Sequence, residues 1–142
     1  MDNCCFNRPY DDQGNLYVLL ETESKLFVQR LISTNEIDLI WSFVLDYENN
    51  DNPFEERKQS IGNWKKLAVL DCDYCNEIVE HAEKLSEFGL KPKDASHIAC
   101  AIFAKAGYFL TTDKKILNKN ETISEISIIN PVEFVRRYLD EQ

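Results

Sequence analysis

Residues 91–117 read KPKDASHIACAIFAKAGYFLTTDKKIL, with an aspartate on each side of an almost wholly apolar centre. Pro92 fits the first turn of a helix, where a missing N–H leaves no hydrogen bond unmade. Apolar residues then recur at helical spacing as far as Gly107, and the YFLT segment that follows is typical of a short buried strand. The stretch therefore predicts a helix and a strand, with Asp94 in the first turn of the helix and Asp113 just after the strand.

Short apolar segments alternate with helical ones along the rest of the chain. Helical spacing and capping residues predict further helices over residues 15–33, 43–50, 53–70, 73–89, 112–118 and 131–140. Apolar runs predict two more strands, over residues 36–42 and 125–130. This alternation indicates an α/β fold whose parallel sheet is covered by helices on both faces. The 142 residues contain no linker or internal repeat, so we expect a single domain, residues 1–142.

Composition and charge restrict the class of protein. Hydrophobic residues make up 44% and charged residues 29%, as in soluble globular proteins, and no apolar run approaches the roughly 18 residues of a membrane helix. The amino end does not resemble a signal peptide and the five cysteines are an odd number, so we expect reduced thiols and a cytoplasmic protein. The net charge of −9 argues against duplex binding, unless cations offset the charge of clustered acids.

Four acids are candidates for a site at one edge of the sheet. Ligands of parallel sheets collect at the carboxyl ends of the strands, and Asp113 directly follows one strand. Glu48 follows another strand and a short helix, while Asp94 and Asp2 would reach this edge only through tertiary packing. Each acid also has a structural alternative, because an acid in a first helical turn contributes about 0.3–1 kcal/mol to helix stability. Together the four offer the oxygen ligands that Mg²⁺ and Mn²⁺ prefer.

An ordered set of segments carries these acids: DNCCFNRPYDD, SFVLDYENNDNP, KPKDASHIACA and FLTTDKKIL. The set resembles the PIN-domain family, the nuclease fold of VapC-type toxins. The first segment is similar to the DTCCxNRPxDD start of a bacterial subgroup, and the likeness extends to SIINPVEFV near the carboxyl end. The resemblance implies a three-layer α/β/α sandwich with a mainly parallel central sheet.

The resemblance also implies an activity, that of a metal-dependent endoribonuclease serving as the toxin of a toxin–antitoxin pair. A bound Mg²⁺ or Mn²⁺ lowers the pKa of its water, which then attacks an RNA phosphodiester. The implied catalytic residues and metal ligands are the same four acids, Asp2, Glu48, Asp94 and Asp113. The residues expected at the substrate are Thr111, Lys93 and Lys114, and Asn3 stands where the family commonly has Thr or Ser. The implied partners are RNA, a small DNA-binding antitoxin and a second copy in a homodimer, with no membrane.

The chain departs from the family pattern before its first acid. Family members have several apolar residues there, which form the central strand, whereas Met1 directly precedes Asp2. We therefore expect a truncated first strand, an Asp2 without rigid support, and exposed edges on the neighbouring strands. This leaves two other hypotheses open: a catalytically impaired PIN-like module that acts as a binding or dimerisation partner, and a phosphatase with the same metal chemistry.

Other polar residues near these segments have simpler interpretations. His97, one turn after Asp94, is predicted to pack at the helix surface, because hard metals prefer oxygen ligands. Arg8 has two alternative partners, a phosphate and a nearby acid. Glu21 is predicted to face solvent or neighbouring loops.

The cysteines suggest a metal site only weakly. Cys72 and Cys75, together with Cys4 and Cys5, would supply four thiolates for zinc, but adjacent ligands suit tetrahedral geometry poorly. A redox role for the CDYC pair lacks a thioredoxin-like context. Cys100 lies on the apolar helix and is predicted to belong to the core.

Overall fold

The computed structural model describes the backbone of residues 1–142 and every side chain except those of Asn3 and Cys4. Its helices are α1 (Asn3–Asn7), α2 (Leu16–Ser33), α3 (Phe43–Asn50), α4 (Glu55–Asn63), α5 (Asn76–Ser86), α6 (Pro92–Phe103), α7 (Lys114–Leu117) and α8 (Pro131–Asp140), with 3₁₀ helices η1 (Arg8–Tyr10) and η2 (Trp64–Leu67). The strands are β1 (Ile40–Ser42), β2 (Leu70–Cys72), β3 (Tyr108–Leu110) and β4 (Ser127–Ile129). The mixed α/β class expected from the sequence is confirmed.

The strands form two parallel pairs. β1 pairs with β2, with Trp41 opposite Asp71, and β3 pairs with β4, with Phe109 opposite Ile128. Within the described backbone neither pair is joined to the other by a strand, so a sandwich around one continuous sheet is not confirmed. The predicted helix over residues 53–70 was wrong at its end, because the apolar LAVL run leads into β2. A short apolar run fits both helical and strand periods, which explains the error.

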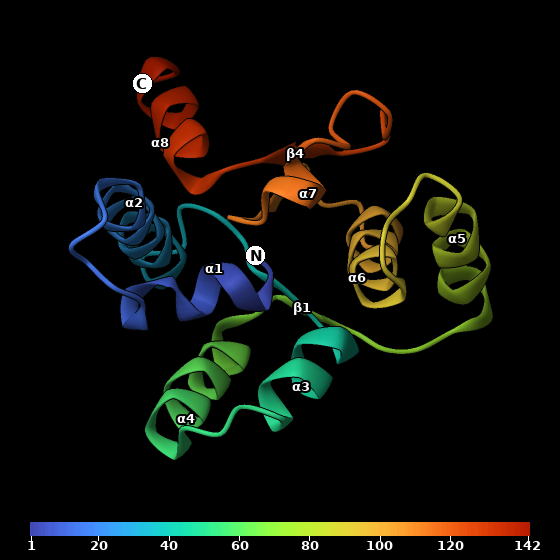
Figure 1. Ribbon diagram of the computed structural model, residues 1–142, viewed down its shortest axis with the longest axis horizontal. Helices are drawn as coiled ribbons and strands as arrows, with labels where there is room; N and C mark the ends of the chain where they lie inside the picture. Colours follow the sequence, from blue (N-terminus) through green and yellow to red (C-terminus); the bar gives the residue numbers. More distant parts are fainter.

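Helices cover both faces of the strand pairs. Figure 1 shows α2 and α8 on one side of the strands and α5 and α6 on the other. Phe109 and Ile128 belong to an apolar cluster with α5 and α6, whereas Leu110 and Ile129 belong to a second cluster with α2 and α8. Successive side chains of a strand point to opposite faces, so this alternation places β3 and β4 between two helical layers.

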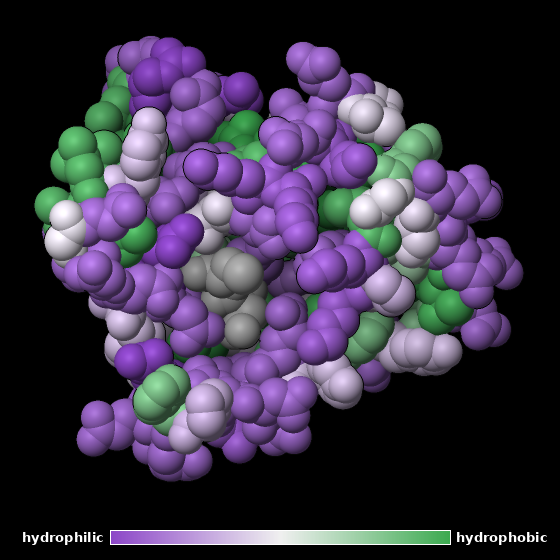
Figure 2. All heavy atoms as spheres, viewed as in Figure 1, coloured by the Kyte–Doolittle hydropathy of each residue, from purple (hydrophilic) through white to green (hydrophobic). Residues whose placement is uncertain are grey.

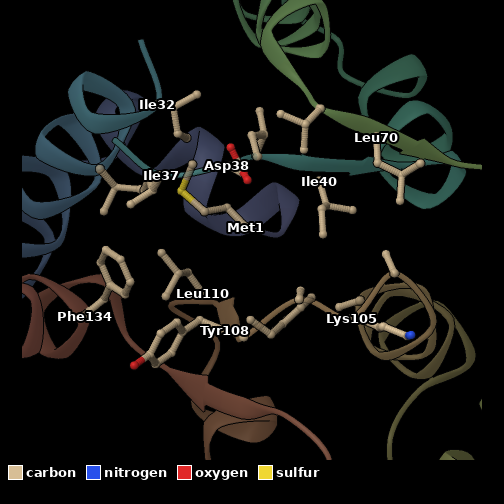
Figure 3. A pocket seen from close by; sticks show the side chains of 18 of the residues that line it. Met1, Ile32, Ile37, Asp38, Ile40, Leu70, Lys105, Tyr108, Leu110 and Phe134 are labelled. Atoms are coloured by element: carbon tan, nitrogen blue, oxygen red, sulfur yellow. The ribbon is translucent and has the colours of Figure 1, made fainter. Parts of the chain in front are cut away.

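A gap between β1 and β3, called the inter-strand slot below, has a volume of about 620 Å³. Figure 3 shows Ile40 on one side of it and Tyr108 and Leu110 on the other. Met1 also lines the slot, next to the point where the backbone N–H of Asp2 donates to the carbonyl oxygen of Leu110 at 3.1 Å. As expected, no strand of the described backbone pairs with the edges of β1 and β3 that line the slot, although the carbonyl oxygen of Leu110 accepts the N–H of Asp2.

Capping residues define several helix ends. The hydroxyl oxygen of Ser42 accepts a hydrogen bond from the N–H of Leu45 at 3.4 Å and begins α3, as expected. Gly89 follows α5 with a φ of +90°, a conformation that favours glycine. The prediction that Gly107 ends α6 was wrong, since the helix ends at Phe103 and Lys105 already adopts a left-handed φ of 60°.

The surface differs between its polar face and the exposed side of α2. Figure 2 shows a face covered mainly by hydrophilic residues, with hydrophobic residues in smaller areas toward its edges. On α2, Leu16 is 68% exposed and Tyr17 78% exposed. Among the described helices, none is both long enough and apolar enough to cross a membrane.

Replacing the glycine after α5 tests its backbone conformation. We expect Gly89→Ala to lower the free energy of unfolding by about 1 kcal/mol or more, because an L side chain is strained in the left-handed region. The added Cβ would also lie 3.3 Å from Nζ of Lys119. Urea denaturation followed by circular dichroism measures the change. Gly107→Ala is the matched control, since its Cβ meets nothing within 4 Å; equal losses in both variants would contradict this explanation.

Candidate functional site

Asp2 is buried at the carboxyl end of β3, and both of its carboxylate oxygens are engaged. Oδ1 accepts a hydrogen bond from the N–H of Cys5 at 3.0 Å, so Asp2 caps the amino end of α1. Oδ2 accepts a hydrogen bond from the hydroxyl of Thr111 at 2.5 Å. These contacts fix the carboxylate in one orientation. The expectation that Asp2 lacks rigid support was therefore wrong, because hydrogen bonds to α1 and to the end of β3 replace the strand.

Thr111 connects Asp2 to Asp113. Its hydroxyl oxygen accepts a hydrogen bond from the N–H of Asp113 at 3.0 Å while the same hydroxyl donates to Asp2. Asp113 in turn accepts a hydrogen bond from the N–H of Lys115 at 2.9 Å and caps α7. Thr111 is 0% exposed, so it has no free surface for the substrate contact predicted for it. It positions the two acids instead.

Glu48 on α3 and Asp94 in the first turn of α6 complete a group of four acids, called the acidic cluster below. Burial is the main cause that raises the pKa of Glu48, and the charges of Asp2 and Asp94 raise it further. Burial likewise raises the pKa of Asp94, with the charge of Asp113 as the next cause. Carboxylates influence one another in this way only at short range. The charges of the four acids are therefore coupled: Asp94 acts on Asp2, Asp2 and Asp94 act on Glu48, and Asp113 acts on Asp94.

Two acids of the cluster, Glu48 and Asp2, have clearly raised pKa values. Burial raises the pKa of Glu48 to about 7. Burial also raises the pKa of Asp2 to about 6, although the hydrogen bonds from Thr111 and Cys5 oppose this increase. A carboxyl group with such a pKa remains partly protonated near neutral pH. A cation bound nearby would lower this pKa and displace the proton.

His97 faces the acidic cluster from α6. The imidazole ring is buried, packs edge-on against Phe109 with ring centres 4.9 Å apart, and places Nδ1 3.8 Å from Oε1 of Glu48. Burial lowers the pKa of His97 to about 3, so the ring stays neutral at physiological pH. The prediction of a packed histidine is confirmed. Its neutral ring lies near Glu48 without supplying a positive charge.

Lysines border the acidic cluster. The positive charges of Lys91 and Lys93 lower the pKa of Asp94, against the larger effect of burial. Nζ of Lys93 lies 4.9 Å from the ring centre of Tyr47, which holds this side chain beside α3. Lys114 is exposed at the start of α7, directly after Asp113. These positions suit contacts with phosphate groups and equally suit solvated charges.

The donor atoms of the cluster suit a hard divalent cation, since all four are carboxylates. Among the side chains that the structure describes, no three His, Cys, Asp or Glu residues lie close enough together to enclose a metal ion directly. Mg²⁺ commonly keeps several waters and takes only one or two carboxylates from the protein. An ion held by two carboxylates and several waters is compatible with this arrangement. Among the described residues, no hydrogen bond occupies a carboxylate oxygen of Glu48 or Asp94, whereas both oxygens of Asp2 and one oxygen of Asp113 accept one.

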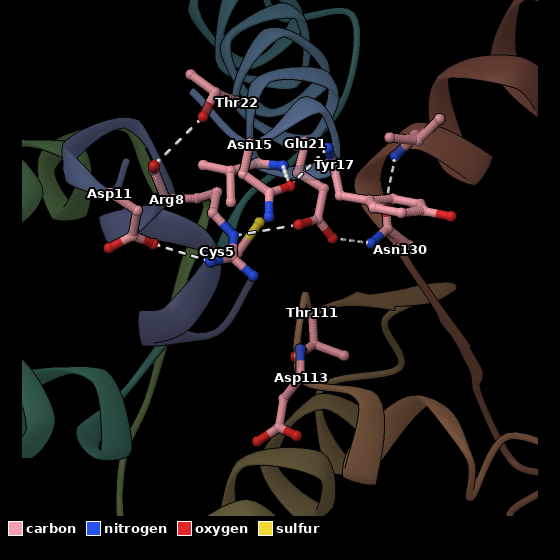
Figure 4. A network of polar contacts seen from close by, with 12 residues as sticks. Cys5, Arg8, Asp11, Asn15, Tyr17, Glu21, Thr22, Thr111, Asp113 and Asn130 are labelled. Carbon is pink, nitrogen blue, oxygen red and sulfur yellow. Dashed lines mark hydrogen bonds and ion pairs between the residues drawn. The ribbon is translucent and has the colours of Figure 1, made fainter. Parts of the chain in front are cut away.

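A second polar network, missed by the sequence analysis, joins the amino end to α2 and α8 (Figure 4). Nε of Arg8 lies 3.1 Å from Oε1 of Glu21, and Nη1 of Arg8 donates to Oδ2 of Asp11 at 3.0 Å. The other oxygen of Glu21 accepts a hydrogen bond from the side-chain amide of Asn130, the residue that caps α8. Arg8 therefore contacts acids, one of the two predicted alternatives. Of the two surroundings predicted for Glu21, solvent and neighbouring loops, the structure shows the second, since Glu21 is buried and contacts Arg8 and Asn130.

The cysteines of the described chain are free thiols, namely Cys5, Cys72, Cys75 and Cys100. Cys72 and Cys100 are buried in the α5–α6 cluster, and Sγ of Cys72 donates to the carbonyl oxygen of Cys100 at 3.8 Å. The prediction that Cys100 belongs to the core is confirmed. The thiolate zinc hypothesis also involved Cys4, whose side chain lies outside the described part of the chain.

Comparisons with protein-family models, with curated proteins and with solved structures gave no match. Functional inference for this chain therefore depends on the acidic cluster, its surroundings and the pattern of the sequence.

Removing the hydroxyl of Thr111 tests the link between the acids. We expect Thr111→Val to lower the free energy of unfolding by about 1–3 kcal/mol, because Asp2 is left buried without one of its hydrogen-bond partners. Thr112→Val is the matched control, since Thr112 is also buried but its hydroxyl makes no hydrogen bond among the described residues. Thermal and urea unfolding measure both variants. A loss from Thr112→Val as large as that from Thr111→Val would contradict the assigned role.

The pKa of Glu48 predicts a pH dependence of stability. The folded pKa of about 7 exceeds the ordinary value of 4.5, so Glu48 stabilises the fold below about pH 4.5 relative to higher pH, and this contribution disappears as pH rises toward 7. Glu48→Gln removes the dependence. In chelator-treated samples we expect the variant to gain about 1 kcal/mol or more over wild type between pH 5 and pH 8, by urea denaturation. A constant difference between the two proteins across this range would argue against the raised pKa.

Proposed function

We propose that the protein is a Mg²⁺- or Mn²⁺-dependent endoribonuclease of the PIN type, serving in the cytoplasm as the toxin of a toxin–antitoxin pair. One observation supports the proposal: acids that lie far apart in the sequence are linked, two of them by hydrogen bonds through Thr111 and all four by the effects of their charges on one another. Asp2, Glu48, Asp94 and Asp113 influence one another electrostatically, and Thr111 connects the first to the last. Partly buried carboxylates that act on one another destabilise the fold unless a cation offsets their charge. Their position near the carboxyl ends of strands therefore supports a metal-binding role.

The residues of the cluster have separate roles in this proposal. Glu48 and Asp94 would hold the metal directly, Asp113 through water, and Asp2 would orient it from its fixed position. When bound, the metal supplies a water of lowered pKa and positive charge beside the scissile phosphate. Thr111 keeps Asp2 and Asp113 at a constant separation. The neutral ring of His97 packs beside Glu48 and would exclude water from that side of the carboxylate, without competing for the metal.

RNA is the proposed substrate because exposed lysine side chains border the acidic cluster. Lys93 and Lys114 would contact backbone phosphates on either side of the scissile bond, where single-stranded or structured RNA presents them. The net charge of −9 opposes binding elsewhere on the surface, so RNA is directed to the metal and the lysines.

Protein partners belong to the same proposal. A small DNA-binding antitoxin would inhibit the ribonuclease, and the chain would form a homodimer. The exposed residues Leu16, Tyr17 and Leu20 of α2 offer an apolar area for one of these contacts.

A second candidate function is favoured by the split between the strand pairs. A chain with unpaired β1 and β3 edges would serve as a catalytically impaired PIN-like module that binds or dimerises. It predicts no RNA cleavage with either metal and no increase of the melting temperature when metal is added.

Substitution of the acids tests the ribonuclease proposal. We expect Asp94→Asn and Asp113→Asn each to reduce RNA cleavage at least about 100-fold, because each removes a charge that places the metal or the attacking water. Cleavage of a labelled structured RNA is measured with Mg²⁺, with Mn²⁺ and with chelator, beside a phosphomonoester that would reveal a phosphatase.

The matched control is Asp140→Asn, which removes an exposed acid at the end of α8. This variant should cleave RNA as wild type does. Full activity of both cluster variants would refute the metal site, whereas an inactive wild type with no metal-induced change in melting temperature would support the binding module.

A further inference from the structure

Tyr47 on α3 presents an exposed aromatic ring directly before Glu48 in the chain. Nζ of Lys93 lies over one face of the ring, 4.9 Å from its centre. The residue is nevertheless 59% exposed. Because Lys93 covers only one face, this exposure leaves the opposite face of the ring open to solvent.

The contacts between α3 and α6 place this ring at the outer rim of the acidic cluster. The two helices lie side by side (Figure 1). Glu48 meets α6 on its buried side, since its Oε1 lies 3.8 Å from Nδ1 of the buried His97. Tyr47 meets α6 on its exposed side, through Lys93. The charge of Lys93 also acts on Glu48 and Asp94, so the ring and the ammonium group border these two acids.

A structural role accounts for only one face of the ring. A cation–π contact between two exposed side chains adds little to stability, and it requires only the face that Lys93 covers. The open face is left for a flat ligand that approaches the acidic cluster from solvent.

An unpaired nucleobase has the chemistry for this open face. Stacking of a base on an aromatic ring needs no charge, so it adds affinity where the net charge of −9 repels phosphate. The ammonium group of Lys93 has three donors and can contact the phosphate of the same nucleotide. A base within a duplex is already paired and stacked, so only a nucleotide of a single strand or loop can reach the ring.

We propose that Tyr47 and Lys93 form a nucleotide subsite, in which an unpaired base stacks on the open face of Tyr47 and its phosphate contacts Lys93 beside the acidic cluster. The inference rests on the proposed ribonuclease function for the identity of the substrate. It adds a requirement to that function: the RNA is single-stranded beside the bond that is cleaved. Tyr47 selects the substrate in this way, while Glu48 and Asp94 hold the metal.

Removing the base and removing the ring, separately and together, tests the subsite. The probes are a fluorescein-labelled octauridylate and an octamer of abasic ribose phosphates with equal charge. Their affinities are measured by fluorescence anisotropy with Mg²⁺, in an Asp113→Asn background that keeps the RNA uncut. We expect the octauridylate to bind at least about tenfold more tightly than the abasic octamer, and Tyr47→Ala to reduce this ratio below about twofold.

Matched variants separate stacking from a general change of the surface. Tyr47→Trp should keep the ratio, because the larger ring also stacks. Tyr17→Ala removes a ring of α2 that is 78% exposed and should leave the ratio unchanged. Circular dichroism checks that each variant is folded, and Tyr47→Leu serves as a second variant without the ring.

Two further conditions separate stacking from charge. Raising the salt from about 50 mM to about 200 mM should weaken the binding of both probes and leave their ratio unchanged, because only the phosphate contacts depend on salt. A short GC-rich RNA duplex should bind equally to Tyr47→Ala and to its parent, because its bases cannot reach the ring.

The outcomes distinguish the subsite from the ribonuclease proposal. Equal ratios in Tyr47→Ala and its parent would overturn the subsite, and RNA cleavage by wild type would then still support the ribonuclease. A ratio that depends on Tyr47 in a protein that cleaves no RNA with either metal would support the subsite and refute the ribonuclease. A Tyr47→Trp variant that loses the ratio as completely as Tyr47→Ala would overturn stacking as the mode of binding.

Discussion

The hydrogen bonds of Asp2 connect parts of the molecule that nothing else in the strand arrangement connects. Its backbone N–H extends the edge of β3, its side chain begins α1, and its second oxygen accepts the hydroxyl of Thr111. Asp2 therefore helps to set the position of α1 relative to β3, together with Phe6 of α1, which packs in the same apolar cluster as Leu110. In a continuous sheet the strand itself would set this position. Here a buried carboxylate with satisfied partners does so, and its raised pKa records the cost of burying it.

Local sequence signals account for most of the helices. Prolines at the start of α6 and α8, Ser42 before α3 and Gly89 after α5 act through their immediate neighbours, so they are visible in the sequence. Strands were harder to predict than helices, because a strand of three residues shows little hydrophobic periodicity. β2 was missed for this reason, with Leu70 assigned to the end of a helix, and its strand conformation comes from pairing with β1, a contact between distant segments.

The sequence pointed to the residues of the acidic cluster but not to how their side chains are held. Residue type and position pointed to the four acids, yet only packing shows that Thr111 is buried and that Asp2 is fixed by two hydrogen bonds. The inward polar face of α2 was missed, because Glu21, Lys25 and Gln29 resemble a solvent-exposed stripe in the sequence. The capping position of Asn130 before Pro131 was the one available signal, since it places a side-chain amide beside α2.

The division of the strands into two pairs also determines how the molecule opens. Cooperative unfolding spreads most readily along a continuous hydrogen-bond ladder, and here the ladder is interrupted between β1 and β3. Both pairs contribute to both apolar clusters, so motion in one pair is transmitted to the other through side-chain packing rather than through strand pairing. The fold therefore contains a boundary in its strand pairing that side-chain packing spans, since each apolar cluster contains residues of both pairs. Partial opening along this boundary would separate Glu48, which follows β1, from Asp113, which follows β3.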